Sequence, residues 1–216
     1  MKSMQIKRIL MSVLGVVICG ISVGMFKHAS LGVDPFQSLM SGLDAVIPIR
    51  FGTLYVIVNA LLLCFALLLD RHKIGIATLI NLFLLGYIAE FSQSFFASVF
   101  PALGITGRLL LLLIAIVILC ISSSLYFTAD LGVSTYDAVS LIWSEKQKKI
   151  PFRFCRIICD LVCVAAGSCL CLAGNVRVIG VIGIGTIVTA FFMGPLIDYF
   201  NRHLAGPLLY GKKYPH

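Results

Sequence analysis

Six long apolar stretches follow one another along the chain, separated by polar segments. Each is close to the roughly 20 mostly apolar residues that an α-helix needs to cross a bilayer. Backbone groups inside a bilayer must satisfy their own hydrogen bonds, so such spans are expected to be helices rather than strands. The pattern predicts an all-α polytopic membrane protein, one transmembrane domain over residues 1–216, with spans at residues 9–26, 51–69, 74–95, 109–129, 157–172 and 178–199.

The composition supports this class. Hydrophobic residues make up 60% of the chain and charged residues 12%, whereas soluble domains carry about 25% charged residues. The net charge of +8 would suggest nucleic acid in a soluble chain. Here the basic residues lie mainly between the spans, where they set orientation and meet lipid headgroups, so we expect the lipid bilayer as a partner and no nucleic acid. No small-residue cleavage pattern follows the first span, which we therefore expect to be retained rather than removed as a signal peptide.

The distribution of Lys and Arg predicts the orientation. Cytoplasmic loops of membrane proteins are enriched in these residues. With a cytoplasmic N-terminus, thirteen of the 17 Lys and Arg residues fall on the cytoplasmic side, and only Lys27, Arg50, Arg108 and Arg177 fall on the outer side. Both termini are therefore predicted to be cytoplasmic.

A repeated motif divides the chain into two halves. Residues 29–38 (ASLGVDPFQS) return at residues 129–138 (ADLGVSTYDA), and residues 75–78 (GIAT) return at residues 183–186 (GIGT). Each repeat carries three predicted spans. Because this number is odd, the second copy enters the membrane from the opposite side. The halves, about residues 9–100 and 109–203, are therefore predicted to be inverted repeats, a recurring plan of membrane transporters.

Each copy of the motif predicts a short helix after the first span of its repeat. Asp34 before Pro35 is typical of an N-cap followed by proline at the first helical position, and Ser134 occupies the equivalent cap. The helices are expected at residues 35–46 and at residues 135–143 or slightly beyond, either re-entrant or lying at the membrane surface. Gly32 and Gly132 precede the caps, where a sharp turn needs a flexible backbone.

Two connections between spans are short enough to form tight hairpins. Residues 70–73 join the second span to the third, and residues 174–177 join the fifth to the sixth. The sequence therefore predicts that spans two and three lie side by side, and likewise spans five and six.

The repeated motif A-x-L-G-V-x-P/T-aromatic resembles the YczE/YyaS/YitT group of bacterial membrane proteins, most closely its YczE-like branch. The stretch Pro151-Phe-Arg-Phe-x-Arg156 with Asp160, followed by the GIGT and GPLID segments at residues 183–186 and 194–198, strengthens the resemblance. It covers nearly the whole chain, from about residue 9 to residue 200. The resemblance implies a multi-pass protein of the bacterial inner membrane. It implies no substrate, because the family has no settled biochemical activity.

Asp160 in the fifth span is the sharpest candidate for a functional residue. A charge at a helix centre costs about 2.5–3.5 kcal/mol on the insertion scale, so intramembrane acids usually face a partner or a water-filled cavity. Arg156 lies one turn earlier on the same face, so an interfacial ion pair is the alternative to a substrate or proton site. Asn59 in the second span is the counterpart of Asp160 in the repeat.

Four further polar residues are candidates for a solute site. Asn81 and Thr189 match one another in the repeat, and they either hydrogen-bond between packed helices or line a central polar site. Asp34 and Asp130 lie at the two turns. Helix N-termini attract anions, but an acid at the turn repels them, so a cation, a proton or a zwitterion is favoured there.

The sequence predicts neither a metal site nor a cofactor nor an enzyme. Cys155, Cys159 and Cys163 share one helical face, but small apolar packing explains this stripe better than zinc thiolates. The four histidines are scattered. We find no nucleophile elbow, HExxH pair, phosphate loop or dinucleotide fingerprint.

Two functional hypotheses remain. A carrier of an unknown small solute requires a polar cavity near the membrane centre, lined by Asn59, Asn81, Asp160 and Thr189. A non-transport partner that stabilises or assists another membrane or biosynthetic complex expects a dry, packed centre with Asp160 against Arg156. Since six spans are few for a carrier, a homodimer is one predicted assembly.

Overall fold

The computed structural model describes residues 2–69, 74–147 and 152–211. All regular elements within these ranges are helical. In chain order they are α1 Lys2–Ala29, α2 Pro35–Val46, α3 Phe51–Leu69, α4 Ile76–Val99, α5 Ile105–Ala129, α6 Thr135–Gln147, α7 Phe152–Ala173, α8 Val178–Val181, α9 Ile184–Phe200, a π-helical turn Asn201–Ala205 and α10 Gly206–Tyr210.

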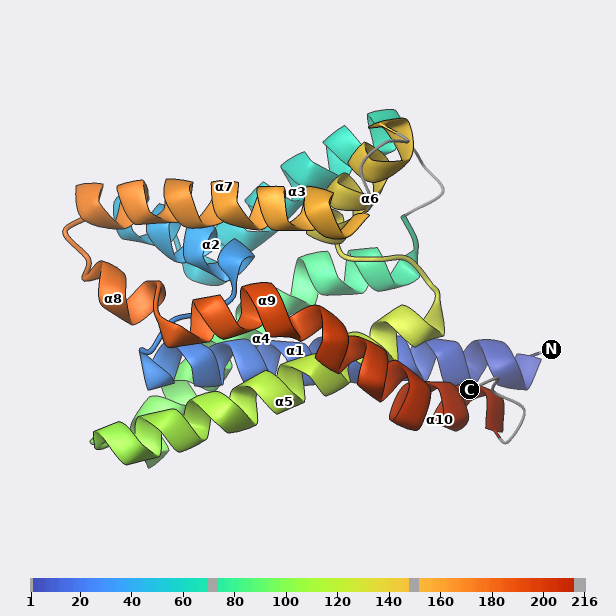
Figure 1. Ribbon diagram of the computed structural model, residues 1–216, viewed down its shortest axis with the longest axis horizontal. Helices are drawn as coiled ribbons and strands as arrows, with labels where there is room; N and C mark the ends of the chain where they lie inside the picture. Colours follow the sequence, from blue (N-terminus) through green and yellow to red (C-terminus); the bar gives the residue numbers. More distant parts are fainter. Residues whose placement is uncertain (1, 70–73, 148–151, 212–216) are drawn as a thin grey trace.

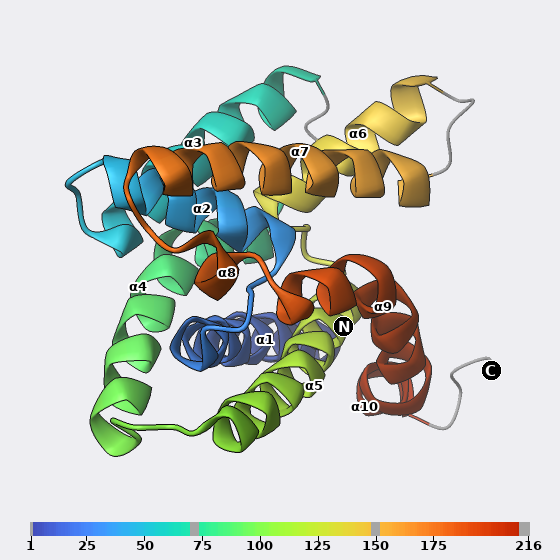
Figure 2. The same ribbon diagram turned by 60° about the vertical axis from the view of Figure 1, so that its left-hand side comes forward.

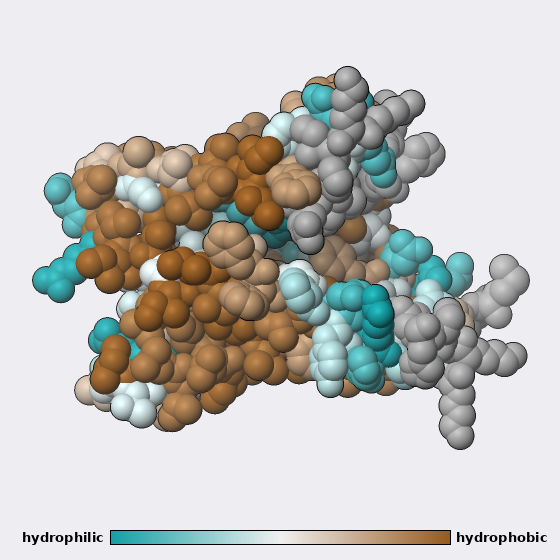
Figure 3. Space-filling view, in the orientation of Figure 1, coloured by the Kyte–Doolittle hydropathy of each residue, from teal (hydrophilic) through white to brown (hydrophobic). Residues whose placement is uncertain are grey.

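Six helical segments are long and apolar enough to cross a membrane. Large apolar side chains such as Leu68 and Phe91 point outward, and Figure 3 shows hydrophobic surface along most of the molecule with hydrophilic surface toward its two ends. Such a surface is stable against lipid and would be unusual for a soluble protein. The predicted class, an all-helical multi-pass membrane protein, is thereby confirmed.

The helices form two layers, which both ribbon views show (Figures 1 and 2). The first layer holds α2, α3, α6 and α7, in which α2 packs on α7 and α6 packs on α3. The second layer holds α1, α4, α5 and α9, with α1 packed along both α4 and α5. Each layer therefore combines helices from both halves of the chain.

Small residues bring these helices close together. A Cβ added to Gly42 on α2 would lie 2.7 Å from the carbonyl oxygen of Gly167 on α7, and one on Gly24 of α1 would lie 2.5 Å from Ser92 on α4. Ser92 Oγ also donates a hydrogen bond to Ile21 O at 3.0 Å. In a bilayer, packing between helices depends on such close approach rather than on a hydrophobic driving force.

The turns after α1 and α5 have the same geometry and make the same contacts. Gly32 has φ +105° and Gly132 has φ +106°, a left-handed region that favours glycine. A Cβ at Gly32 would lie 2.6 Å from Gly183 N, and one at Gly132 would lie 2.5 Å from Gly75 N. Each turn therefore needs glycine twice over, for its conformation and for its contact with the other half.

Backbone hydrogen bonds join each turn to a long helix of the other half. Gly185 N–H donates to Leu31 O at 2.9 Å, and Ala77 N–H donates to Leu131 O at 3.0 Å. The start of α9 is thus fixed to the first turn, and the start of α4 to the second. The two halves interlock through these contacts.

The short helices begin as the cap residues predict. Gln37 N–H donates to Asp34 Oδ1 at 3.2 Å at the start of α2, and Asp137 N–H donates to Ser134 Oγ at 3.1 Å at the start of α6. The bounds of α2 agree with the prediction, and α6 continues past residue 143 to Gln147.

The sixth span is confirmed as a segment long and apolar enough to cross a membrane, from Val178 to Tyr210, but the C-terminal part departs from the expectation in two ways. The sixth predicted span is interrupted, because Ile182 and Gly183 are extended between α8 and α9. This break frees Val181 O to accept a hydrogen bond from Val33 N–H at 2.9 Å, so the contact with the first turn explains it. The fifth and sixth spans also meet less than expected: in the described residues α7 contacts α8 but packs mainly on α2 and α6, and α9 packs mainly on α5. The predicted hairpin at residues 70–73 lies outside the described residues, but α3 and α4 do pack together.

Candidate functional site

A cavity of about 70 Å³ lies between the two layers. It is large enough for a few water molecules, which need roughly 10–15 Å³ each by this measure. The first turns of α2 and α6 reach it, together with side chains from α1, α3, α4, α5, α7 and α9. Its most polar lining residues are Asp34, Gln37, Asn59, Asn81, Asp137 and Arg156.

Arg156 on α7 lies at the centre of a buried ionic cluster. Its Nη1 donates to Asp137 Oδ1 on α6, and its Nε donates to Asp160 Oδ1 one helical turn later at 3.2 Å. The guanidinium also lies over the ring of Tyr136, 4.6 Å from the centroid. A buried charge is tolerated only when it is paired and hydrogen-bonded in this way.

Hydroxyl groups also donate hydrogen bonds to the two acids. Tyr136 OH donates to Asp160 Oδ1 at 2.6 Å. Asp137 Oδ2 accepts hydrogen bonds from Tyr126 OH at 3.0 Å and from Ser134 Oγ at 2.6 Å. The cluster therefore joins α5, α6 and α7 around one wall of the cavity.

The opposite wall, on α3 and α4, is polar but uncharged. Asn59 Nδ2 donates to Tyr55 O at 2.8 Å, and Asn59 Oδ1 accepts from the Thr135 hydroxyl of α6. Tyr55 OH donates to Asn81 Oδ1 at 3.3 Å. Phe36 lies between the walls, stacked on Tyr136 at a centroid distance of 4.9 Å and edge-on to Tyr55 at 6.0 Å.

Asp34 is the acid of the cavity without an ionic partner in the described part of the chain. It belongs to the connection between α1 and α2, outside the six spanning helices, and its Oδ1 accepts the helix-cap hydrogen bond from Gln37 N–H at 3.2 Å. Burial raises the pKa of the Asp34 carboxyl to about 6. Asp137 and Asp160 already outnumber Arg156 in the cluster, so an ionised Asp34 adds further negative charge to the site.

The structure brings three of the six predicted site residues to the cavity. Asp34, Asn59 and Asn81 line it, and Asp160 lies directly behind Tyr136 and Arg156.

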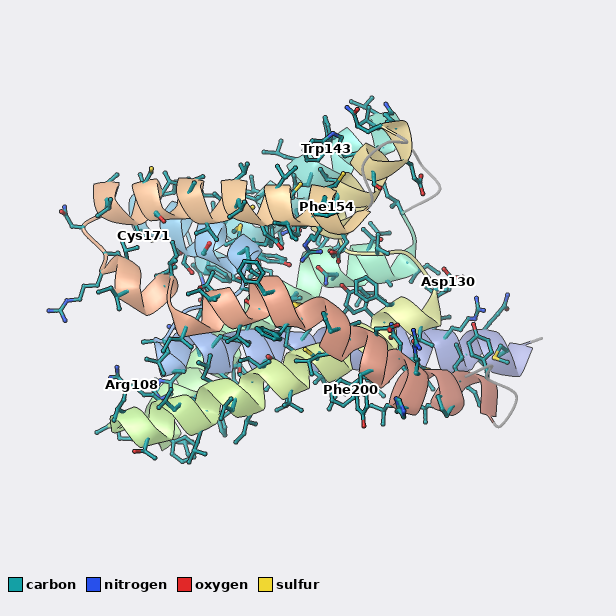
Figure 4. The ribbon with its side chains drawn as sticks, viewed as in Figure 1. Arg108, Asp130, Trp143, Phe154, Cys171 and Phe200 are labelled. Carbon is teal, nitrogen blue, oxygen red and sulfur yellow. The ribbon has the colours of Figure 1, made fainter. Side chains whose placement is uncertain are left out.

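The other two lie elsewhere. Thr189 bonds within its own helix, to Gly185 O at 2.9 Å and Thr186 O at 3.1 Å, since its hydroxyl completes backbone contacts where α9 begins. Asp130 has a side chain 82% exposed at the end of α5, 3.9 Å from Arg8, because the turn carries it away from the layers (Figure 4).

The sequence analysis missed Gln37, Asp137 and the tyrosines of the cluster. Gln37 and Asp137 occupy equivalent positions in the repeat, three residues after the caps. Because positions i and i+3 share a helical face, any site at the caps must include them. This periodicity was the available signal.

These features define a multi-pass helical membrane protein with a partly open cavity, lined by polar and apolar residues, between two interlocked layers. The chain belongs to the family described as a family of unknown function (DUF6198), whose family model matches residues 6–202. The expected resemblance to YczE and YyaS is confirmed.

Curated relatives of low identity cover most of the chain. The uncharacterized protein YyaS of Bacillus subtilis (strain 168) is 22% identical over 87% of this chain and 89% of its own. The uncharacterized membrane protein YczE of the same organism is 25% identical over 86% of this chain and 81% of its own. An uncharacterized protein of Haemophilus influenzae is 24% identical over 93% of this chain and 86% of its own. No solved structure matches the chain.

Proposed function

We propose that this protein is a carrier of a small solute, not an enzyme, and that the solute passes through the cavity between the two helix layers. The observation that carries this proposal is the position of the cavity, which lies where the first turns of α2 and α6 converge and is lined from both halves of the chain. Carriers built from inverted repeats bind their substrates at such an interface, near the starts of short or broken helices.

We infer that the two halves are inverted repeats and that α2 and α6 are re-entrant. In Figure 1, α1 runs from right to left and α5 from left to right, and the pairs α3 with α7 and α4 with α9 also run in opposite directions. The matched turns at Gly32 and Gly132 and their reciprocal hydrogen bonds support the same inference.

A difference between the halves supports alternating access. α3 packs along α4, and Glu90 of α4 binds Arg50 at 3.1 Å and Gly52 N–H at 3.2 Å at the start of α3. The equivalent helices α7 and α9 do not pack on one another in the described residues, and Asp198 pairs instead with Arg202 of its own segment. In the described residues the layers therefore pack together through α3 and α4 in the first half, but not through the equivalent α7 and α9 in the second. Exchange of these two arrangements would open the cavity to alternate sides of the membrane.

We place the protein in the bacterial inner membrane with both termini in the cytoplasm. The few outer basic residues include Arg108, which Figure 4 shows at the end of the molecule opposite Asp130. Cysteines introduced for Asp130 and Arg177 would report the orientation. A membrane-impermeant thiol reagent should reach the first only from the cytoplasmic side and the second only from outside, and the reverse pattern would invert the orientation.

The alternative function, a membrane partner of another complex, has one specific observation in its favour. Asp160 Oδ1 accepts hydrogen bonds from both Arg156 and Tyr136, as the carboxylate of a purely structural ion pair would. The cavity favours the carrier because a structural centre would be expected to pack without it.

Thiol accessibility of Cys19 tests the carrier proposal without knowledge of the solute. Cys19 lines the cavity, so it would be kept as the only cysteine and exposed to an impermeant reagent from each side of oriented vesicles. Alternating access predicts labelling from both sides. Protection from both sides, or labelling from one side alone, contradicts it. A second variant that keeps only Cys64, which is exposed on the outer surface of α3, should stay unlabelled as a lipid-facing control.

The homodimer remains a prediction. Mass measurement of the protein in lipid nanodiscs should find two copies, and a lone protomer would contradict it.

A further inference from the structure

We infer that the cavity binds a small organic ammonium ion, with Asp34 as its counter-charge and Gln37 as a hydrogen-bond acceptor. The inference rests on the proposed function, since it names the chemical class of the solute that the same cavity would carry.

The charges around the cavity are unbalanced. Arg156 is held by Asp137 and Asp160, so its positive charge is already matched within the cluster. Asp34 lines the same cavity and has no ionic partner among the described residues. An unpaired carboxylate in a region of low dielectric is costly, and a bound cation would remove that cost.

Gln37 supplies a second and independent observation. Its side chain is buried, at 3% exposure, and it lines the cavity one turn after Asp34. Its Oε1 atom has no hydrogen-bond partner in the described structure. Buried polar atoms nearly always have a partner, so an orphan acceptor in a cavity points to a missing donor. An ammonium group carries such donors and a positive charge.

The remaining walls favour an organic cation over a metal ion. Val23, Leu85, Leu119 and Met193 provide apolar surface, and Phe36 and Tyr55 provide aromatic surface. Aromatic rings attract organic cations, whereas Ca²⁺ or Mg²⁺ need six or more oxygen ligands or bound waters. No group of three or more His, Cys, Asp or Glu residues in the described ranges is arranged to hold a metal. The volume of about 70 Å³ fits a methylammonium-sized ion.

The test measures binding of methylammonium chloride to the full-length protein in nanodiscs of neutral lipid, by calorimetry and by thermal stabilisation. Sodium chloride, tetramethylammonium chloride and sodium acetate are the comparison probes. Methylammonium should bind, and the other probes should bind at least about tenfold more weakly. Sodium and tetramethylammonium are cations without N–H donors, and acetate is an anion. Equal binding of tetramethylammonium or preferred binding of acetate would overturn the inference.

Three variants locate the binding. Asp34→Asn keeps a good helix N-cap but removes the charge, and it should weaken methylammonium binding about tenfold or more. Gln37→Met should weaken it several-fold. Asp130→Asn makes the same change at an exposed acid away from the cavity and should leave binding unchanged. Wild-type affinity in Asp34→Asn would overturn the inference, and thermal unfolding of each variant shows whether it is folded.

Uptake into proteoliposomes separates this inference from the proposed function. Binding of methylammonium without uptake, together with a Cys19 that is closed to both sides, would sustain the ammonium site and reject the carrier. Labelling of Cys19 from both sides without binding of methylammonium would sustain the carrier and reject the ammonium site.

Discussion

The α2–α3 region and the α6–α7 region occupy equivalent places in the repeat but differ in charge. Where α7 has Arg156 and Asp160 one turn apart, α3 has Tyr55 and Asn59. Both pairs contact the same short helix, α6, Asn59 through Thr135 and Asp160 through Tyr136.

The comparison separates what the two halves share from what they do not. The turns that hold the halves together keep the same glycines and the same hydrogen bonds. The positions facing the cavity have diverged, from Phe36 and Gln37 in the first half to Tyr136 and Asp137 in the second. Backbone contacts are therefore shared, and the chemistry of the cavity is not.

The largest effect is expected from removing the positive charge of Arg156 in the α6–α7 region. Arg156→Met leaves Asp137 and Asp160 buried without their cation and should destabilise the fold by about 3–5 kcal/mol. The change at the equivalent position of the α2–α3 region, Tyr55→Phe, removes one hydrogen bond and should lower the free energy of unfolding by about 1 kcal/mol. Unfolding in mixed micelles would measure both.

A rescue variant separates charge from packing at this site. Arg156→Met combined with Asp137→Asn and Asp160→Asn should recover much of the lost stability, because no buried charge is then unpaired. A single Arg156→Met variant as stable as the wild type would refute the ionic cluster.

The shared turns should respond alike. Gly32→Ala and Gly132→Ala each force a side chain into a left-handed conformation and against a backbone nitrogen, which should cost about 2–4 kcal/mol. Gly194→Ala is the matched control, since its Cβ would meet nothing within 4 Å. If only one turn proved sensitive in the same unfolding assay, the equivalence of the two turns would fail.

The α2–α3 region contributes one titrating acid, Asp34, to the cavity. The pKa of Asp34 is raised to about 6 by burial, with Arg156 lowering it and Asp160 raising it; Asp137 and three tyrosines also line this space. Methylammonium needs the ionised carboxylate. Its affinity should therefore approach its maximum well above pH 6, be about half of it near pH 6, and fall about tenfold per pH unit well below it, as calorimetry across about pH 4.5–8 would measure. In Asp34→Asn this dependence should disappear, and an unchanged profile would assign it to another group.

The smallest effect on stability is expected from removing the Tyr126 hydroxyl, which donates to Asp137 of the charged cluster. Tyr126→Phe removes a donor to Asp137 and should destabilise the fold by about 1 kcal/mol. Tyr87→Phe removes an exposed bond to Thr53 and should cost less. Equal thermal shifts in the two variants would show that the bond to Asp137 has no special weight.

Much of the fold could be predicted because its causes are local. Hydropathy located the spans, and Asp34, Pro35 and Ser134 located the starts of the short helices. The break at Gly183 could not be predicted in this way, since it follows from a contact with Leu31 far away in the chain.

Part of the site could also be predicted, because some of its residues stand out in the local sequence pattern. Asp34, Asn59 and Asn81 stood out as polar residues at repeated positions, and Asp160 as an acid within a span. The bond between Arg156 and Asp137 depends on how α6 crosses α7, which no local pattern specifies. Thr189 matched Asn81 in the repeat, but its hydroxyl donates to Gly185 O within its own helix, and the residue does not line the cavity.

Distances between helix pairs test the central claim, exchange between two arrangements of the layers, most directly. Spin labels at Ile158 on α7 and Ile187 on α9 would report one pair, and labels at Leu61 on α3 and Phe83 on α4 would report the other; all four side chains are exposed. Double electron–electron resonance in nanodiscs should find two distance populations for each pair, and Glu90→Ala should shift the α3–α4 pair toward separation as the α7–α9 pair closes. A single distance for each pair, unchanged by Glu90→Ala, would contradict the account.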